Sequence, residues 1–370
     1  MTDHVDRIGR LLAEAECLND GPARIALVQQ AVAIADNLKD VELAFGVRKS
    51  LLGVCLEADE CELMLVTFTW CLAQHDRDPE RFPADLILWP FRWVVSSLPT
   101  FAEVTRTKID EMKDDMAARY MRAGASPRAF HLMCRKMAVD MGNVAAATAA
   151  DRELRKAPSD WLSDGSTTEQ GFEITYRLFR REYAKALEAA RPFLARQFRS
   201  DHFEGQACAD ALFLLLRADR AAEAIPYHRR GYKLRYKQIR HLDSIGKHIA
   251  FLSLTDNIPR AVRLFEKHLP QALQSSNAFN RLRFLMESFP LLDRLTKGDK
   301  ESGRLRRPPG CPVDGKSNSV PVRDLRKWLH EMTADLARTF DARNGNTYYT
   351  ERLAALPRLQ RWFMPCPLTR

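Results

Sequence analysis

Residues 180–194, RREYAKALEAARPFL, show the clearest helical pattern in the chain. Their apolar side chains are spaced by three or four positions, at Tyr183, Ala186, Leu187, Ala190, Phe193 and Leu194. Residues at this spacing lie on one face of an α-helix, because the helix completes a turn every ~3.6 residues. The segment therefore predicts an amphipathic helix with one buried face.

The same pattern recurs three more times, at residues 140–154, 217–234 and 254–269. In each copy a polar turn precedes an apolar residue, and a small residue follows that residue by three positions. The turns are Gly142-Asn143, Arg181-Glu182, Asp219-Arg220 and Asp256-Asn257, and the small residues are Ala147, Ala186, Ala224 and Ala261. A small side chain at this position lets two helices approach closely, since a larger one would hold their axes apart.

Three weaker copies extend the pattern toward the N-terminus. They place Ala26, Met64 and Val104 at the small position. The seven positions are separated by 37 to 43 residues. A near-constant period of this length is typical of stacked helical hairpins, because insertions fall in the loops between helices.

The turn and the second helix of each copy resemble the second half of a tetratricopeptide (TPR) unit, G-D/N-Y-x-x-A-[IL]. This resemblance implies an all-α, right-handed α-solenoid of about seven TPR-like helical hairpins over residues 5–295. The spacing is longer than the ~34 residues of a TPR unit. The first helices match the TPR pattern poorly, with Thr175, Ala211 and Ala250 the nearest small residues. A divergent HEAT-type solenoid is therefore the alternative fold.

Three helix starts are indicated by capping signals. Ser126 followed by Pro127 is typical of an N-cap and the first helical position. Thr100 with Glu103, and Ser166 with Glu169, match the capping box, in which two side chains satisfy main-chain N–H groups at a helix start.

The composition changes after the predicted repeats. We expect a helical solenoid over residues 1–295, then a flexible Pro/Gly-rich loop or linker over 296–321. Helical spacing returns in the last part of the chain, so 322–370 is interpreted as a C-terminal helical cap that covers the end of the solenoid.

Composition indicates an ordinary folded protein, with 46% hydrophobic and 28% charged residues. Lys and Arg exceed Asp and Glu by 57 to 48, a formal charge of +9, with which an acidic partner is compatible. Eight cysteines without a CxxC pair favour reduced thiols. No signal peptide is recognisable, and the longest apolar runs are too short to cross a bilayer. We therefore expect a cytoplasmic protein without membrane contact.

The sequence contains no complete motif for phosphate binding, metal binding or nucleophilic catalysis. Residues 310–317, GCPVDGKS, fit the phosphate-binding P-loop string, but that site needs a buried strand before it and a helix after it. A charged, proline-broken stretch precedes the string and Pro321 follows it, so the P-loop is rejected. His330-Glu331 lacks the second histidine of a zinc helix, and no nucleophile elbow is present. We predict no catalytic residue, no metal site and no cofactor, and hence a protein that is not an enzyme.

A basic stretch with interleaved tyrosines, HRRGYKLRYKQIRH at residues 228–241, is the candidate binding site. If it is helical, Arg229, Lys233, Lys237 and Arg240 form one cationic stripe. The candidate binding residues are Arg229, Arg230, Tyr232, Lys233, Tyr236, Lys237 and Arg240. Such a surface can hold an acidic peptide, or phosphates with the rings stacking on bases. It is also compatible with an ordinary solvated helix face whose side-chain stems cover apolar surface.

The leading hypothesis is a non-catalytic protein–protein interaction scaffold that binds a peptide or another protein in the solenoid groove. The first alternative is a helical-repeat protein that binds nucleic acid through residues 228–241. The second alternative is a regulator that senses a peptide or metabolite inside the superhelix.

Overall fold

The computed structural model describes residues 2–19, 21–58, 60–198, 200–236, 238, 241–297, 303–313 and 317–368. Contacts within the chain divide it into two compact units. The first comprises Met1–Met137 and Ala150–Ser163, and the second comprises Ala138–Ala149 and Asp164–Arg370.

The first unit is built from α-helices. These are α1 (Thr2–Glu16), α2 (Pro22–Asn37), α3 (Val41–Ala58), α4 (Cys61–Arg77), α5 (Ala84–Ser97) and α6 (Arg106–Arg122), with a short 3-10 helix η1 (Leu98–Thr100) after α5. The next two helices, α7 (Arg128–Asp140) and α8 (Val144–Lys156), are shared between the units, and the turn that joins them belongs to the second.

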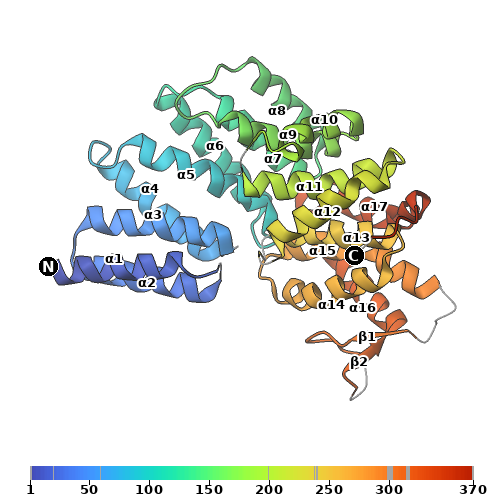
Figure 1. Ribbon diagram of the computed structural model, residues 1–370. Coiled ribbons are helices and arrows are strands. Elements are labelled where there is room, and N and C mark those ends of the chain that lie inside the picture. The colour runs from blue at the N-terminus through green and yellow to red at the C-terminus, as the bar shows by residue number, and fades with distance from the viewer. Residues whose placement is uncertain are drawn as a thin grey trace. The chain divides into compact units, whose positions relative to one another are not determined.

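The second unit continues with α9 (Ser166–Phe179), α10 (Tyr183–Leu194), α11 (Asp201–Arg217), α12 (Ala221–Arg235), α13 (Leu242–Leu254), α14 (Ile258–Gln274) and α15 (Ala278–Lys297). Two short strands follow, β1 (Arg304–Arg306) and β2 (Ser319–Pro321), and then α16 (Val322–Asn344), α17 (Tyr348–Ala355) and the 3-10 helix η3 (Leu356–Trp362). Figure 1 shows these elements along the chain from green to red. The all-α class predicted from the sequence is confirmed.

One turn geometry recurs before four second helices, α8, α10, α12 and α14. Gly142, Arg181, Asp219 and Asp256 are all left-handed, with φ between 57° and 71°. In each turn the next residue donates its main-chain N–H to the carbonyl five positions earlier, at 2.8–2.9 Å. This is the Schellman arrangement that satisfies carbonyl groups at a helix end. The second helix then begins two residues after the left-handed residue.

The small residues predicted for these four helices are buried where the pattern places them. Ala147, Ala186, Ala224 and Ala261 are all 0% exposed. Each stands four positions after the residue that precedes its helix. Met64 of α4 stands in the same position and is 1% exposed, although its side chain is large. These five predicted positions are confirmed.

The other two predicted positions are wrong. Ala26 is exposed, and the neighbouring Ile25 is the buried residue four positions after the N-cap of α2. Val104 lies in a bend before α6, and Ile109 occupies the equivalent position of that helix, at 1% exposure. With these corrections the described chain has seven consecutive helix pairs, from α1–α2 to α13–α14.

Two of the three capping signals also need correction. The Thr100 hydroxyl donates to the carbonyl of Ser97 and ends the 3-10 helix η1, so it does not start a longer helix. Helix α9 begins at Ser166 itself, after Gly165 and without a side-chain cap. The Ser126 hydroxyl does accept the Arg128 N–H at the start of α7, at 3.2 Å.

The Pro/Gly-rich segment contains a two-stranded antiparallel hairpin that the sequence did not predict. Leu305 of β1 pairs with Val320 of β2, and both side chains are buried. The main-chain N–H of Arg306 donates to a carboxylate oxygen of Glu266 on α14, at 2.7 Å. The P-loop-like string lies between these strands and not between a strand and a helix, although residues 314–316 lie outside the described chain.

The core of the second unit lies between neighbouring helix pairs. One cluster joins α11, α12 and α13 through Ala211, Leu212, Leu215, Leu216, Ala221, Ala224, Phe251 and Leu254. Helix α16 then packs on α15, and α17 packs on α16. Arg352 of α17 forms an ion pair with Glu287 of α15. The division into solenoid, linker and cap proposed from the sequence remains a prediction.

Candidate interaction surface

The predicted basic stretch lies on α12 as far as Arg235, where that helix ends. Arg229 and Lys233 are exposed and lie one turn apart on the same face. Lys237 and Arg240 lie outside the described residues. The structure therefore brings two of the four predicted stripe residues together on one helix face.

Arg230 lies on the inner side of α12 and holds that helix in place. Its guanidinium donates to the carbonyl of Leu194 at 2.8 Å and forms an ion pair with Glu204 at 3.0 Å. It also contacts the Cys208 thiol at 3.4 Å. Because these partners come from α10 and α11, Arg230 connects three helices and is occupied by internal contacts.

The two tyrosines of the stretch are covered by α14. The Tyr232 hydroxyl shares a hydrogen bond with Nε2 of His268, at 3.0 Å. The Lys267 ammonium lies 4.8 Å from the centre of the Tyr236 ring and 5.9 Å from that of Tyr232. A cation over an aromatic face is attracted to it. Both rings are therefore engaged within the protein.

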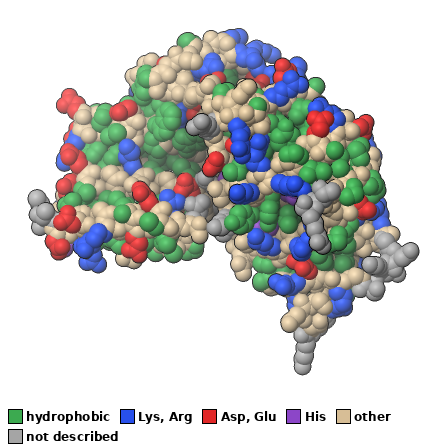
Figure 2. All heavy atoms as spheres, viewed as in Figure 1, with side chains coloured by type: hydrophobic (Ala, Val, Ile, Leu, Met, Phe, Trp, Pro, Cys, Tyr) green, Lys and Arg blue, Asp and Glu red, His purple; other side chains and the backbone are tan. Residues whose placement is uncertain are grey.

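Further exposed cations stand on the neighbouring elements. Arg263 and Lys267 lie one turn apart on α14, and Arg306 lies on β1. We call Arg229, Lys233, Arg263, Lys267 and Arg306 the basic face. Figure 2 shows blue Lys and Arg side chains close together over the α12–α14 part of the second unit.

Sequence reasoning missed three members of the basic face. The spacing of Arg263 and Lys267 on a predicted helix was a usable signal, because residues four apart share a face. Arg306 gave no such signal, since its place depends on the hairpin and on the bond from its main-chain N–H to Glu266.

A pair of buried histidines joins α12 to α13. Nδ1 of His228 and Nδ1 of His248 are 3.1 Å apart, so the N–H of one ring donates a hydrogen bond to the ring nitrogen of the other. Burial, with Arg260 and Arg229 nearby, lowers the pKa of His228 to about 4. Burial and the neighbouring His228 also lower the pKa of His248 well below its usual value. The pair is therefore uncharged at neutral pH.

No group of three or more His, Cys, Asp or Glu residues suited to a metal ion occurs in the described part of the chain. None of the described helices combines the length and the apolar character needed to span a bilayer.

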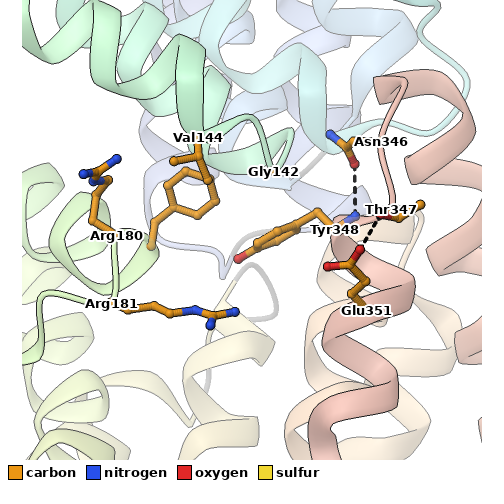
Figure 3. A pocket seen from close by; sticks show the side chains of 9 residues that line it. Gly142, Val144, Arg180, Arg181, Asn346, Thr347, Tyr348 and Glu351 are labelled. Atoms are coloured by element: carbon orange, nitrogen blue, oxygen red, sulfur yellow. Dashed lines mark hydrogen bonds between the residues drawn. The ribbon is translucent and has the colours of Figure 1, made fainter.

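A pocket of about 390 Å³ lies among three turns of the second unit, a size within the range of small-ligand sites. Its lining residues are Gly142, Val144, Phe179, Arg180, Arg181, Asn346, Thr347, Tyr348 and Glu351. In Figure 3 the Arg181 side chain and the Tyr348 hydroxyl point toward each other, and Glu351 lies nearby. The Thr347 hydroxyl donates to Glu351 at 2.6 Å. The pocket thus offers a cation, a phenol and a carboxylate over an apolar floor.

No protein-family model matches the chain, and no curated protein matches it. Among solved structures, the TPR domain of P58(IPK) aligns over 97% of this chain and 98% of that chain, with 10% identity and a TM-score of 0.23. The repeated Schellman turn, followed each time by a buried small residue, shows that the helix pairs are a structural repeat. The described chain is an all-α protein of repeated helix pairs.

Proposed function

We propose that this helical repeat is a cytoplasmic, non-catalytic protein-interaction module that binds an acidic segment of another protein. The supporting observation is the basic face, where five exposed cations stand on α12, α14 and β1. Glu266 lies among them, and one of its carboxylate oxygens accepts the main-chain N–H of Arg306.

Like charges that gather on one surface repel one another, and binding of a partner of opposite charge relieves this repulsion. The same charges attract such a partner during its approach to the surface. The long stems of Arg and Lys can also cover apolar surface without any partner. Lys267 of α14 lies 4.8 Å from the ring centre of Tyr236, so it adds a positive charge close to the end of α12 that carries Lys233.

The covered tyrosines favour an acidic protein over nucleic acid. Single-stranded nucleic acid is usually held by bases that stack on free aromatic rings. Here the half-buried Tyr232 ring packs against the rings of His248 and His268. The half-buried Tyr236 ring has the Lys267 ammonium 4.8 Å from its centre, so both rings already have partners within the protein. The charges remain available, because the ammonium of Lys233 and the guanidinium of Arg263 are exposed.

Fluorescence anisotropy with a labelled glutamate-rich peptide tests this proposal. The variant carries Lys233→Glu and Lys267→Glu, one change on each helix of the basic face. Its affinity for the peptide should fall at least about tenfold, which corresponds to about 1.4 kcal/mol. Binding by the wild type should also weaken between about 50 and about 200 mM salt, because the attraction is electrostatic.

A matched control carries Arg152→Glu and Arg191→Glu, which change the net charge by the same amount. Both arginines are exposed on second helices, α8 and α10, that carry no residue of the basic face. Equal loss of binding in the two double variants would show a net-charge effect and refute the site. A labelled single-stranded oligonucleotide that binds more tightly than the peptide would favour the nucleic-acid alternative.

The turn pocket supports a second candidate function, a regulator that senses a small ligand. A zwitterion such as a free amino acid has a carboxylate for Arg181 and an ammonium for Glu351. A ligand that binds only the folded state raises the melting temperature. Thermal shift against the free amino acids, with Arg181→Ala as the comparison, tests this candidate, and no shift at millimolar ligand would eliminate it.

A further inference from the structure

Residues 363–368, FMPCPL, lie extended against the turn between α13 and α14. We call these residues the PxP segment. The main-chain N–H of Met364 donates to the carbonyl of Leu254 at 2.8 Å, and that of Cys366 donates to the carbonyl of Thr255 at 3.1 Å. These carbonyls stand at the end of α13, where a helix leaves its last acceptors without internal partners. The segment therefore donates hydrogen bonds to carbonyl groups that the end of α13 leaves available.

The prolines of the segment fit this hydrogen-bonding pattern. Met364, Cys366 and Leu368 donate their N–H groups to the turn, whereas Pro365 and Pro367 have no N–H to donate and are exposed. In an extended chain alternate residues face the same way. Every main-chain donor that faces the turn is thus used, and each residue that faces away is a proline.

The side chain of Asn257 binds the main chain of the segment on two sides. Its Nδ2 donates to the carbonyl of Cys366 at 3.0 Å, and its Oδ1 accepts the N–H of Leu368 at 3.0 Å. An amide that both donates to and accepts from one extended chain recognises peptide backbone irrespective of side chains.

The side chains of the segment provide the apolar part of the contact. Met364 and Cys366 pack against the cluster that contains Leu254, and Leu368 is buried. The guanidinium of Arg294 lies 4.3 Å from the centre of the Phe363 ring and forms an ion pair with Asp256 at 2.9 Å.

We infer that the surface under the PxP segment, formed by Leu254, Thr255, Asn257 and Arg294 and called the groove below, is a recognition site for extended peptides of the pattern apolar–Pro–x–Pro–apolar. In this chain the PxP segment occupies the groove as an internal ligand. A partner that carries the same pattern displaces it and takes over the same three N–H bonds. Residues 364–368 can leave without breaking a helix, because the described main-chain hydrogen bonds of Met364, Cys366 and Leu368 are made with residues 254–257.

Proline favours this kind of site because it restricts the free peptide to an extended form, so less conformational entropy is lost on binding. The groove differs from the basic face in the kind of contact that it makes. Its contacts are main-chain hydrogen bonds and apolar packing. Binding here should therefore depend little on salt, unlike binding of an acidic segment to the basic face.

The test uses the full chain with Cys366→Pro and a labelled synthetic peptide, WFMPCPL. The substitution removes the N–H that bonds to Thr255 and leaves the groove intact. The peptide should bind this variant at least about tenfold more tightly than the wild type, because the internal ligand competes less. A folded variant that binds the peptide no better than the wild type overturns the inference.

Three controls sharpen the comparison. Pro367→Ala in the full chain alters an exposed ring without removing a donor, so peptide binding should increase much less than in the Cys366→Pro chain. The peptide WFMPPPL lacks the donor to Thr255 and should bind at least about tenfold more weakly than WFMPCPL. Addition of Asn257→Ala to the Cys366→Pro chain should abolish the gain in affinity; if the gain survives, the peptide binds elsewhere.

Hydrogen exchange on the wild-type chain gives an independent readout if the variant fails to fold. Excess WFMPCPL should increase amide exchange in the chain's own Met364, Cys366 and Leu368, because displacement exposes these N–H groups to water. Unchanged protection at saturating peptide would show that the segment is a permanent part of the fold, and would refute displacement.

Discussion

The Tyr349 hydroxyl donates a 2.6 Å hydrogen bond to the main-chain carbonyl of Asp140, although 209 positions separate the two residues. Next to it, the Asn346 side chain donates to the carbonyl of Met141 at 2.7 Å. Together these bonds attach the start of α17 to the turn between α7 and α8. The two acceptors hold the same positions relative to Gly142 as Leu254 and Thr255 hold relative to Asp256.

Tyr349→Phe should destabilise the second unit by about 1–3 kcal/mol, because the main-chain carbonyl of Asp140 loses its buried hydrogen-bond donor. Tyr349 is 2% exposed, so water cannot easily replace the hydroxyl. Urea unfolding at equilibrium measures the change. The matched control is Tyr183→Phe, whose hydroxyl has no described hydrogen bond, and a similar loss in both variants would contradict the assignment to the Asp140 bond.

Ala224→Leu should destabilise the fold by about 1–3 kcal/mol, because the extra methyl groups have no room between α11 and α12. Ala224 is 0% exposed and belongs to the core cluster of these helices. Ala222→Leu on the same helix is the control, because Ala222 is exposed and its substitution should stay within about 0.5 kcal/mol. Equal midpoints of thermal unfolding for the two variants would show that this position tolerates a large side chain.

The repeat could be predicted wherever the turn and the small residue occur together. Asp256 with Ala261 and Gly142 with Ala147 each combine a residue that tolerates the left-handed region with a small side chain five positions later. Arg181 has no such preference, and its turn could be recognised only by comparison with the other copies. The period of the repeat was therefore stronger evidence than any single turn.

The same reasoning failed where a large residue fills the buried position. Ile25 and Ile109 occupy it in α2 and α6, so a search for small residues selected Ala26 and Val104 instead. The hairpin was missed for a different reason, because a strand of three residues such as β1 is too short to show alternation.

The candidate site could be predicted only in part, because exposure depends on residues distant in sequence. Arg229 and Arg230 are adjacent, yet one is exposed and the other is paired with Glu204 on α11. Likewise, nothing in the sequence around Tyr232 indicates that His268 binds its hydroxyl. Helical spacing identifies a face, but the neighbouring helix determines which side chains on that face remain available.

Gly246→Ala should destabilise the second unit by about 1–3 kcal/mol through the contact between α13 and α15. A Cβ atom at this position would lie 2.8 Å from Cβ of Glu287 and 3.2 Å from the carbonyl oxygen of Phe284. Neither of these atoms is the free end of a flexible side chain, so the helices must separate. Gly53→Ala in α3, where a Cβ would meet nothing within 4 Å, should instead be neutral or stabilise by up to about 1 kcal/mol.

Chemical unfolding of the Gly246 variant checks this expectation. A larger separation of α13 and α15 should lower the urea midpoint of the second unit and leave Gly53→Ala at or above the wild-type midpoint. If the Gly246 variant is as stable as the wild type, the close approach of these two helices does not limit the stability of the fold.

The buried histidine pair predicts that stability falls as the pH drops from 7 toward 5. His228 has a pKa of about 4 in the folded chain, against 6.5 for an ordinary histidine, because burial and the nearby Arg260 and Arg229 oppose its protonation. Between these values the unfolded state binds more protons than the folded state, so the free energy of unfolding decreases as pH falls. The contribution is present above about pH 6.5, and about 2 kcal/mol of it should be lost by about pH 5.

Urea unfolding at about pH 7.5 and about pH 5 measures this loss. His228→Asn keeps a polar side chain beside His248 but cannot be protonated. The difference in the free energy of unfolding between the two pH values should therefore become smaller. His4→Asn changes an exposed histidine of α1 and should leave the wild-type difference intact. If His228→Asn retains the full wild-type difference, other groups cause the acid sensitivity. The pair would then act through packing between α12 and α13 and not through its protonation.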